Sequence, residues 1–192
     1  MKLILATTNK HKAKEINEIM SKHGYKIITK KIRLIEPDFD TLEEIAKYKA
    51  IQAYETLKKP VITEDTGVYF CEYKNFPGVH AKRIFESIGF KGLITLIKTA
   101  KNKKAYFKTT IVYYNGKISK TFSGKLEGTL LEKPVSIKKD RLPYEKIFVP
   151  KGQKKALVDL SLEQKNKISH RAKATKKMLK WLKKIKSAMG KN

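Results

Sequence analysis

Residues 3–20 have the sequence LILATTNKHKAKEINEIM, which joins a short apolar run to an amphipathic pattern through three small polar residues. The run at 3–6 predicts a buried strand, and Thr7-Thr8-Asn9 is typical of the end of a strand and the start of a helix. The apolar residues after it have the spacing of a helix with one buried face: Ala13, Ile16, Ile19 and Met20. A strand that leads directly into such a helix favours an α/β fold.

The first turn of this helix carries the positively charged or titratable side chains Lys10, His11, Lys12 and Lys14. Cations there oppose the positive end of the helix dipole, at about 0.3–1 kcal/mol each. A bound anion would reverse the sign of that interaction, and the free backbone N–H groups of a helix start favour a phosphate. The alternative is that lysine is so common in this chain that some fall in any turn.

Length and composition indicate one globular domain. A chain of 192 residues with 41% hydrophobic residues is long enough for one well-buried core and short for two. Apolar runs are far shorter than the roughly 20 residues of a membrane span, and we expect no membrane association. The single cysteine, Cys71, cannot form an internal disulfide. Together with the lack of a recognisable signal peptide, it leads us to expect a cytoplasmic protein.

The net charge of +26 suggests nucleic-acid binding, but the residue types argue against it as the main function. Of the 44 basic residues only four are arginine, the residue preferred for base contacts and planar phosphate clamps. The lysines are spread over every segment. We therefore expect incidental polyanion binding at low salt, and a lysine-rich nucleic-acid-binding protein remains the alternative from another functional class.

The remaining patterns predict a sheet with helices on its faces, in one α/β domain over 1–192 that has two lobes. Capping boxes, Thr41-x-x-Glu44 and Ser161-x-x-Gln164, open a helix ending before Pro60 and a last long helix. Asn115-Gly116 indicates a hairpin with a type I′ turn over 106–125. The other expected elements are strands within 25–35, at 61–63, 68–71 and 147–149, and helices ending at 88 and over 91–97.

Glu64-Asp65 is the strongest candidate for chemistry, because we expect it at the end of a buried strand beside Gly67. Adjacent carboxylates are hard to bury, so both are expected to face a cleft. Mg²⁺ prefers such oxygen ligands and needs only one or two of them besides water and phosphate. A solvated turn is the alternative interpretation. Glu36 is a further acidic candidate, and Arg171, beside His170, is one of the few arginines in the chain.

Four motifs in order resemble the inosine triphosphate pyrophosphatase family, whose members hydrolyse non-standard purine nucleoside triphosphates. The motifs are Thr7-Thr8-Asn9-Lys10-His11-Lys12 followed by Glu15, Glu64-Asp65-Thr66-Gly67, Phe76-Pro77-Gly78-Val79-His80 with Lys82 and Arg83, and Glu163-Gln164-Lys165-Asn166-Lys167-Ile168-Ser169-His170-Arg171. The resemblance covers nearly the whole chain. It implies an elongated two-lobed α/β domain with a long mixed β-sheet flanked by helices, a nucleotide cleft between the lobes, and a homodimer.

The resemblance also implies the reaction and the residues that perform it. A nucleoside triphosphate such as ITP, dITP or XTP would be hydrolysed to the monophosphate and pyrophosphate with Mg²⁺. Asp65, with Glu64 or Glu36, would bind the metal, and Asp65 with Lys12 would be catalytic. His170 and Arg171 would donate to the purine 6-oxo group, which adenine lacks. The full set of implied substrate-binding residues is Thr7, Thr8, Asn9, Lys12, Lys49, Thr66, Lys82, Arg83, Leu142, Tyr144, Glu145, Lys165, Ser169, His170 and Arg171.

The chain departs from the family pattern at several positions, and those within 142–148 bear on base selection. Thr8 replaces a glycine, Leu142 replaces the aromatic residue that stacks on the base, and Glu145 replaces an aspartate. Glu36 precedes Pro37, whereas the family has its acidic residue after a proline. A related nucleotide pyrophosphatase with altered base preference is therefore the enzymatic alternative. The pyrimidine-preferring family with the same fold is disfavoured because its Arg-Arg motif after the first strand is missing.

Overall fold

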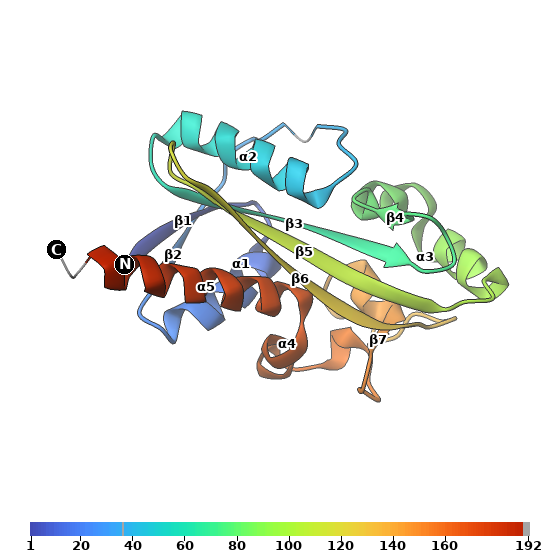
Figure 1. The fold of residues 1–192 in the computed structure, drawn as a ribbon. Coiled ribbons are helices and arrows are strands. Elements are labelled where there is room, and N and C mark those ends of the chain that lie inside the picture. The colour runs from blue at the N-terminus through green and yellow to red at the C-terminus, as the bar shows by residue number, and fades with distance from the viewer. Residues whose placement is uncertain (36, 190–192) are drawn as a thin grey trace. The chain divides into compact units, whose positions relative to one another are not determined.

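The computed structural model describes residues 1–35 and 37–189 (Figure 1). Two short 3-10 helices, η1 (Pro143–Ile147) and η2 (Leu157–Asp159), flank β7 in the chain. The other elements are β1 (Lys2–Ala6), α1 (Lys10–Ser21), β2 (Lys26–Lys30), α2 (Leu42–Leu57), β3 (Val61–Phe70), β4 (Pro77–Gly78), α3 (Ala81–Thr99), β5 (Lys104–Tyr114), β6 (Ser119–Leu130), β7 (Phe148–Pro150), α4 (Leu162–Ile168) and α5 (His170–Met189).

The strands form one mixed sheet in the order β2-β1-β3-β5-β6-β7, with β4 paired to β3. Strand β1 is parallel to both β2 and β3, with Ile4 opposite Ile28 and Val61. The pairs β3–β4 and β6–β7 are antiparallel. The predicted fold class, α/β with a mixed sheet flanked by helices, is therefore confirmed.

The chain forms two compact units. Unit 1 comprises Met1–Asp65, Thr109–Gly124 and the chain from Ser169 onward, and unit 2 comprises Thr66–Lys108 and Lys125–Ile168. Strands β3, β5 and β6 contribute residues to both units. The prediction of one two-lobed domain over 1–192, and that of a cleft between the lobes, stay predictions.

In unit 1 the sheet carries helices on both faces. Alternate residues of a strand point to opposite faces, and the core divides accordingly. On one face Ile62 and Ile111 pack with side chains of α1 and α5, such as Ile16 and Met178. On the other face the neighbouring strand residues pack against the small residues of α2, in a cluster that includes Ala46, Ala50, Ala53, Val61 and Val112.

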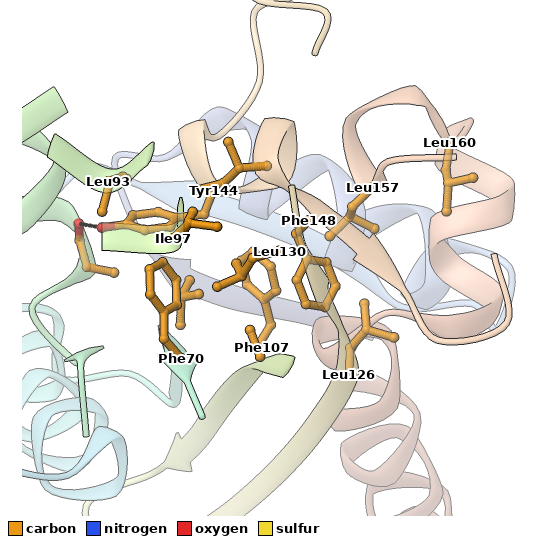
Figure 2. Close-up of a cluster of buried hydrophobic side chains, with 14 residues drawn as sticks. Phe70, Leu93, Ile97, Phe107, Leu126, Leu130, Tyr144, Phe148, Leu157 and Leu160 are labelled. Carbon is orange, nitrogen blue, oxygen red and sulfur yellow. Dashed lines mark hydrogen bonds between the residues drawn. The ribbon is translucent and has the colours of Figure 1, made fainter. Parts of the chain in front are cut away.

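Unit 2 has its own core of aromatic and aliphatic side chains, shown in Figure 2. Phe107 and Phe148 meet edge to face, with their ring centroids 4.8 Å apart. Tyr144 is buried in the same cluster, and its hydroxyl donates to the carbonyl of Ala81 at 2.8 Å. Burial raises the pKa of the Tyr144 hydroxyl above its ordinary value.

The prediction of two strands separated by a turn at 64–67 is wrong, because β3 runs without interruption from Val61 to Phe70. Gly67 has a packing function instead of a turn function. A Cβ there would lie 2.7 Å from the carbonyl oxygen of Gly78, so only glycine allows β4 to approach so closely. Glu64 and Asp65 consequently lie inside a strand. Their Cβ atoms leave the backbone on opposite faces, but a carboxylate oxygen of each lies within 4.0 Å of Lys12 Nζ.

The prediction of one long C-terminal helix is also wrong. The Ser161–Gln164 capping box is present, with Ser161 N to Gln164 Oε1 at 2.9 Å and Gln164 N to Ser161 Oγ at 3.1 Å, but it opens only α4. Ser169 then starts α5, because its hydroxyl accepts from the backbone N–H of Ala172 at 3.1 Å. Because the helix is interrupted at Ser169, His170 and Arg171 lie in the first turn of α5.

The hairpin between β5 and β6 is confirmed, but its turn differs from type I′. Gly116 has a positive φ of 89°, but Asn115 does not, whereas a type I′ turn would require a positive φ at both residues. The Asn115 side chain instead accepts from the N–H groups of Lys117 and Ile118, at 3.1 and 2.7 Å. This Asx-type capping lets asparagine hold the turn without a left-handed backbone.

Helix α3 confirms the two predicted helical stretches, since Gly89 interrupts it with φ 56° and ψ −163°. Across residues 1–35 and 37–189, none of the helices is long and apolar enough to cross a membrane.

Candidate functional site

The start of α1 has the features of an anion site. Asn9 is the N-cap, and its Oδ1 accepts from the backbone N–H of Lys12 at 3.1 Å. Thr7 supports this loop, because its hydroxyl accepts from Asn9 N at 3.1 Å. The first turn carries no acidic side chain, and Thr8 is exposed. The backbone N–H groups at this end therefore form the positive end of the helix dipole, and no acidic side chain of the first turn offsets their charge.

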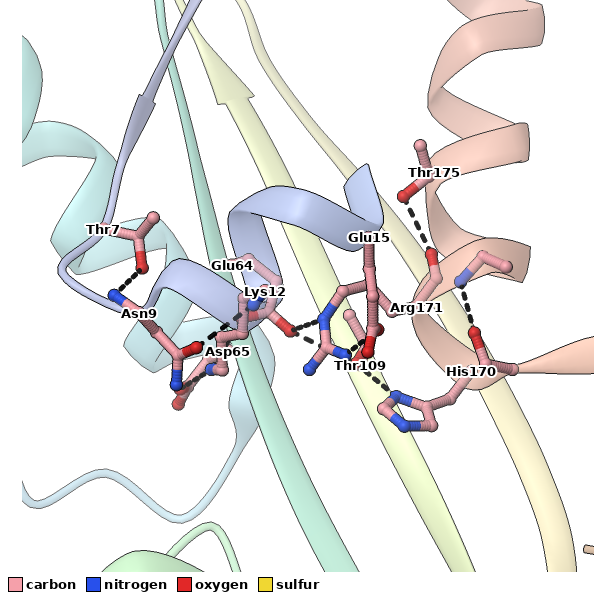
Figure 3. A network of polar contacts seen from close by, with 12 residues as sticks. Thr7, Asn9, Lys12, Glu15, Glu64, Asp65, Thr109, His170, Arg171 and Thr175 are labelled. Atoms are coloured by element: carbon pink, nitrogen blue, oxygen red, sulfur yellow. Dashed lines mark hydrogen bonds and ion pairs between the residues drawn. The ribbon is translucent and has the colours of Figure 1, made fainter. Parts of the chain in front are cut away.

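Lys12 connects this helix start to the acidic pair of β3 (Figure 3). Its Nζ lies 2.6 Å from Glu64 Oε2 and 4.0 Å from Asp65 Oδ1. From α2, on the other face of the sheet, Lys49 Nζ lies 3.8 Å from the same Asp65 oxygen. The Glu64 side chain is 2% exposed, whereas that of Asp65 is 16% exposed. The expectation that both carboxylates face a cleft is therefore not met at Glu64, which is buried.

Arg171 connects two carboxylates from different elements. Its Nε donates to Glu64 Oε1 at 3.0 Å, and its Nη1 pairs with Glu15 Oε2 of α1. The side chain of Arg171 is 1% exposed, and that of Glu15 is 6% exposed. A guanidinium suits this position because its planar fork presents several donors in fixed directions. Figure 3 shows the guanidinium between the two carboxylates.

Thr109 and His170 complete the buried side of the network. The Thr109 hydroxyl lies 2.6 Å from His170 Nδ1 and donates to Glu64 Oε1 at 3.3 Å. His170 is 2% exposed. Gly124 allows α5 to approach the sheet here, since a Cβ at this position would lie 2.1 Å from the His170 carbonyl oxygen. The cations Lys12, Lys49 and Arg171 thus pair with the carboxylates of Glu15, Glu64 and Asp65.

Glu15 and Thr109 are members of the network that we did not predict as site residues. Glu15 had a recognisable signal, because it lies next to Ile16 and four residues before Ile19, on the apolar face of its helix. A carboxylate on such a face needs a buried cation as its partner. Thr109 had no signal, since threonine is common in strands.

The other predicted substrate-binding residues, apart from Ser169, belong to unit 2. Lys165 Nζ and Glu145 Oε1 lie 2.7 Å apart, in side chains that are 5% and 2% exposed. Tyr144 is in the core described above. Lys82 and Arg83 are exposed at the start of α3, while Thr66 and Leu142 are partly buried. The roles predicted for these residues stay predictions.

Metal binding has a limited but adequate donor set. Within the described part of the chain, no group of three or more His, Cys, Asp or Glu side chains could hold a metal ion. Glu36 lies outside the described residues, so its predicted role as a ligand stays a prediction. Glu64 and Asp65 are hard oxygen donors, and a carboxylate pair with water and substrate phosphates is the set that Mg²⁺ usually takes. The residues present therefore fit this ion.

Comparison with known proteins identifies the family of the chain. A model of the Ham1 family matches residues 3–181. A dITP/XTP pyrophosphatase of Hyperthermus butylicus is 38% identical over 181 residues, which are 94% of either chain. An inosine triphosphate pyrophosphatase of Yarrowia lipolytica is 33% identical over 180 residues, 93% of this chain and 94% of that protein. A HAM1 protein structure from Coxiella burnetii has a TM-score of 0.83 at 22% identity, covering 96% and 99% of the two chains, which shows the common fold.

Proposed function

Because the chain belongs to the Ham1 family, we propose that it hydrolyses non-standard purine nucleoside triphosphates to the monophosphate and pyrophosphate. The names of its relatives give the substrate class, which includes dITP, XTP and ITP. One observation in the structure carries the proposal: Lys12, Lys49, Glu64 and Asp65 converge beside the start of α1. Cations for a triphosphate and carboxylates for a metal thus lie together in unit 1.

The triphosphate would bind at the start of α1. Asn9 caps the helix, and the backbone N–H groups and the Lys12 ammonium would provide positive charge for the phosphates. Lys49 adds a second ammonium next to Asp65. Phosphoryl transfer needs mainly positioning and charge neutralisation, which this set of residues supplies.

Asp65 and Glu64 would hold Mg²⁺, which when bound supplies charge neutralisation and a more acidic water. Asp65 is the more exposed of the two carboxylates, so we assign it to position or deprotonate the attacking water. Glu64, fixed through Oε1 by Arg171 and Thr109, would be the less mobile ligand.

Base selection is assigned to the residues named by the resemblance. His170 lies at the start of α5, where its Nδ1 is 2.6 Å from the Thr109 hydroxyl, and Arg171 follows it. Donors that meet a 6-oxo group would be left unpaired by adenine, which makes the wrong base costly. Arg171 is already engaged by two carboxylates, so we expect it to affect base selection mainly through the position of its neighbour His170.

The test is an assay of the purified protein with Mg²⁺ and a panel of ITP, dITP, XTP, GTP, ATP and CTP. Monophosphate and pyrophosphate should form in equal amounts, fastest from ITP and XTP. Asp65→Asn, which is nearly isosteric, should lower turnover at least ~100-fold while the far-ultraviolet circular dichroism spectrum stays unchanged.

Glu55→Gln serves as the matched control, because it removes one exposed carboxylate of α2 that pairs with Lys58 outside the cluster, and it should leave turnover within a few-fold. Release of orthophosphate in place of pyrophosphate would contradict the proposal. Equal rates on all six nucleotides would contradict the assigned substrate class.

Two further expectations accompany this function. The resemblance leads us to propose that the protein is a homodimer and that it is cytoplasmic. Light scattering after size-exclusion chromatography measures the oligomeric state. A mass near 22.1 kDa would show a monomer, and twice that mass a dimer.

A further inference from the structure

Both oxygens of the Glu64 carboxylate have partners in the protein. Oε1 accepts from Arg171 Nε at 3.0 Å and from Thr109 at 3.3 Å, and Oε2 lies 2.6 Å from Lys12 Nζ. The Arg171 contact is buried on both sides, with side chains 1% and 2% exposed. The Lys12 side chain is 17% exposed, so it is the partner with room to move.

The same ammonium is a candidate ligand of the triphosphate, because Lys12 lies in the first turn of α1 beside the capped helix start. Asp65 is within reach of two lysines, with Lys12 at 4.0 Å and Lys49 at 3.8 Å. Without nucleotide, the groups assigned to phosphate and the groups assigned to metal therefore neutralise one another.

We propose that Lys12 couples the metal site to the triphosphate site by occupying Glu64 until a triphosphate draws its ammonium away. The proposal rests on the proposed function, because it takes Glu64 as a metal ligand and Lys12 as a phosphate ligand. A divalent cation alone has to displace Lys12 from Glu64 to reach the carboxylate. A free triphosphate has to draw Lys12 away from Glu64 and leave that carboxylate without this partner. The metal–triphosphate complex satisfies both partners at once, so the site selects that complex over either component.

The experiment measures the affinity for a metal in the absence of any nucleotide. Phosphates bind Mg²⁺ directly and would give cooperativity without Lys12, so only the metal is titrated. Mn²⁺ is used as the probe, with free Mn²⁺ followed by electron paramagnetic resonance and Mg²⁺ as the competitor. Lys12→Met should bind Mn²⁺ at least about tenfold more tightly than the wild type, within the coupling range of roughly 5- to 150-fold usual for linked sites.

The control separates loss of this ion pair from loss of a positive charge in general. Lys14→Met removes one charge from the same helix at an exposed position, and it should change Mn²⁺ affinity by less than about threefold. Adding Glu64→Gln to Lys12→Met should abolish the gain, because the released carboxylate is then missing. Circular dichroism confirms folding, and Lys12→Gln, which is expected to act in the same direction, replaces Lys12→Met if that variant does not fold.

Equal or weaker Mn²⁺ binding by the Lys12 variants would overturn the proposal. So would an equal gain in Lys14→Met, or a gain that persists after Glu64→Gln. The function itself is tested separately by pyrophosphate release from ITP with the wild type. Pyrophosphate release without a gain in Lys12→Met refutes only the coupling, and absence of hydrolysis refutes the function whatever the metal titration gives.

Discussion

At the scale of single residues, Arg171 shows why one arginine is used in a chain that otherwise prefers lysine. Its guanidinium bridges Glu64 and Glu15, which come from β3 and α1. Removing one partner of a buried ion pair leaves an uncompensated charge, and here two carboxylates would lose their common cation. Arg171→Ala should therefore lower the free energy of unfolding in urea by roughly 3–5 kcal/mol.

Adding Glu15→Gln to Arg171→Ala should recover part of this loss, because one unpaired charge is then removed. Arg33→Ala, at an exposed position, should change the free energy of unfolding by less than about 0.5 kcal/mol. Similar effects of Arg171→Ala and Arg33→Ala would show that the buried network does not contribute to stability.

At the scale of elements, the contact of α5 with β6 depends on Gly124. A Cβ on Gly124 would meet two backbone atoms, the His170 oxygen at 2.1 Å and Ala174 N at 2.7 Å, and backbone cannot rotate away. Gly124→Ala should therefore shift α5 and lower the free energy of unfolding by about 1–3 kcal/mol, as overpacking does. Urea denaturation measures this, with the exposed Thr121→Ala on the same strand as the control. An unchanged midpoint in Gly124→Ala would show that α5 does not lie this close to β6.

At the scale of the whole molecule, the net charge of +26 predicts salt-sensitive binding to polyanions. Because lysines supply 40 of the 44 basic residues, we expect affinity without base readout. Binding to a labelled DNA duplex should be independent of sequence and fall by roughly 10³-fold or more between 50 and 200 mM salt. Fluorescence anisotropy with two unrelated duplexes measures both properties. Selective binding at 200 mM salt, in a protein without pyrophosphatase activity, would favour the nucleic-acid alternative.

The sequence by itself determined the fold class, the family and most elements, because these depend on local signals. Asn9, Thr41 and Ser161 cap helices as predicted, since a cap needs only a side chain a few residues from its N–H. The same locality explains the errors. Gly67 was predicted to be a turn residue because glycine is common in turns. Its actual reason is the close approach of Gly78 on another strand, which local sequence does not show.

Only the tertiary structure decided what the charged residues contact. Local sequence places Glu64 beside Asp65, but only the fold brings Arg171 of α5 to Glu64 and Lys49 of α2 to Asp65. Arg171 lies 107 positions from Glu64 and 156 from Glu15, so no local pattern could pair them. A buried charge must find a partner within a few ångströms, and packing brings that partner from a distant part of the chain.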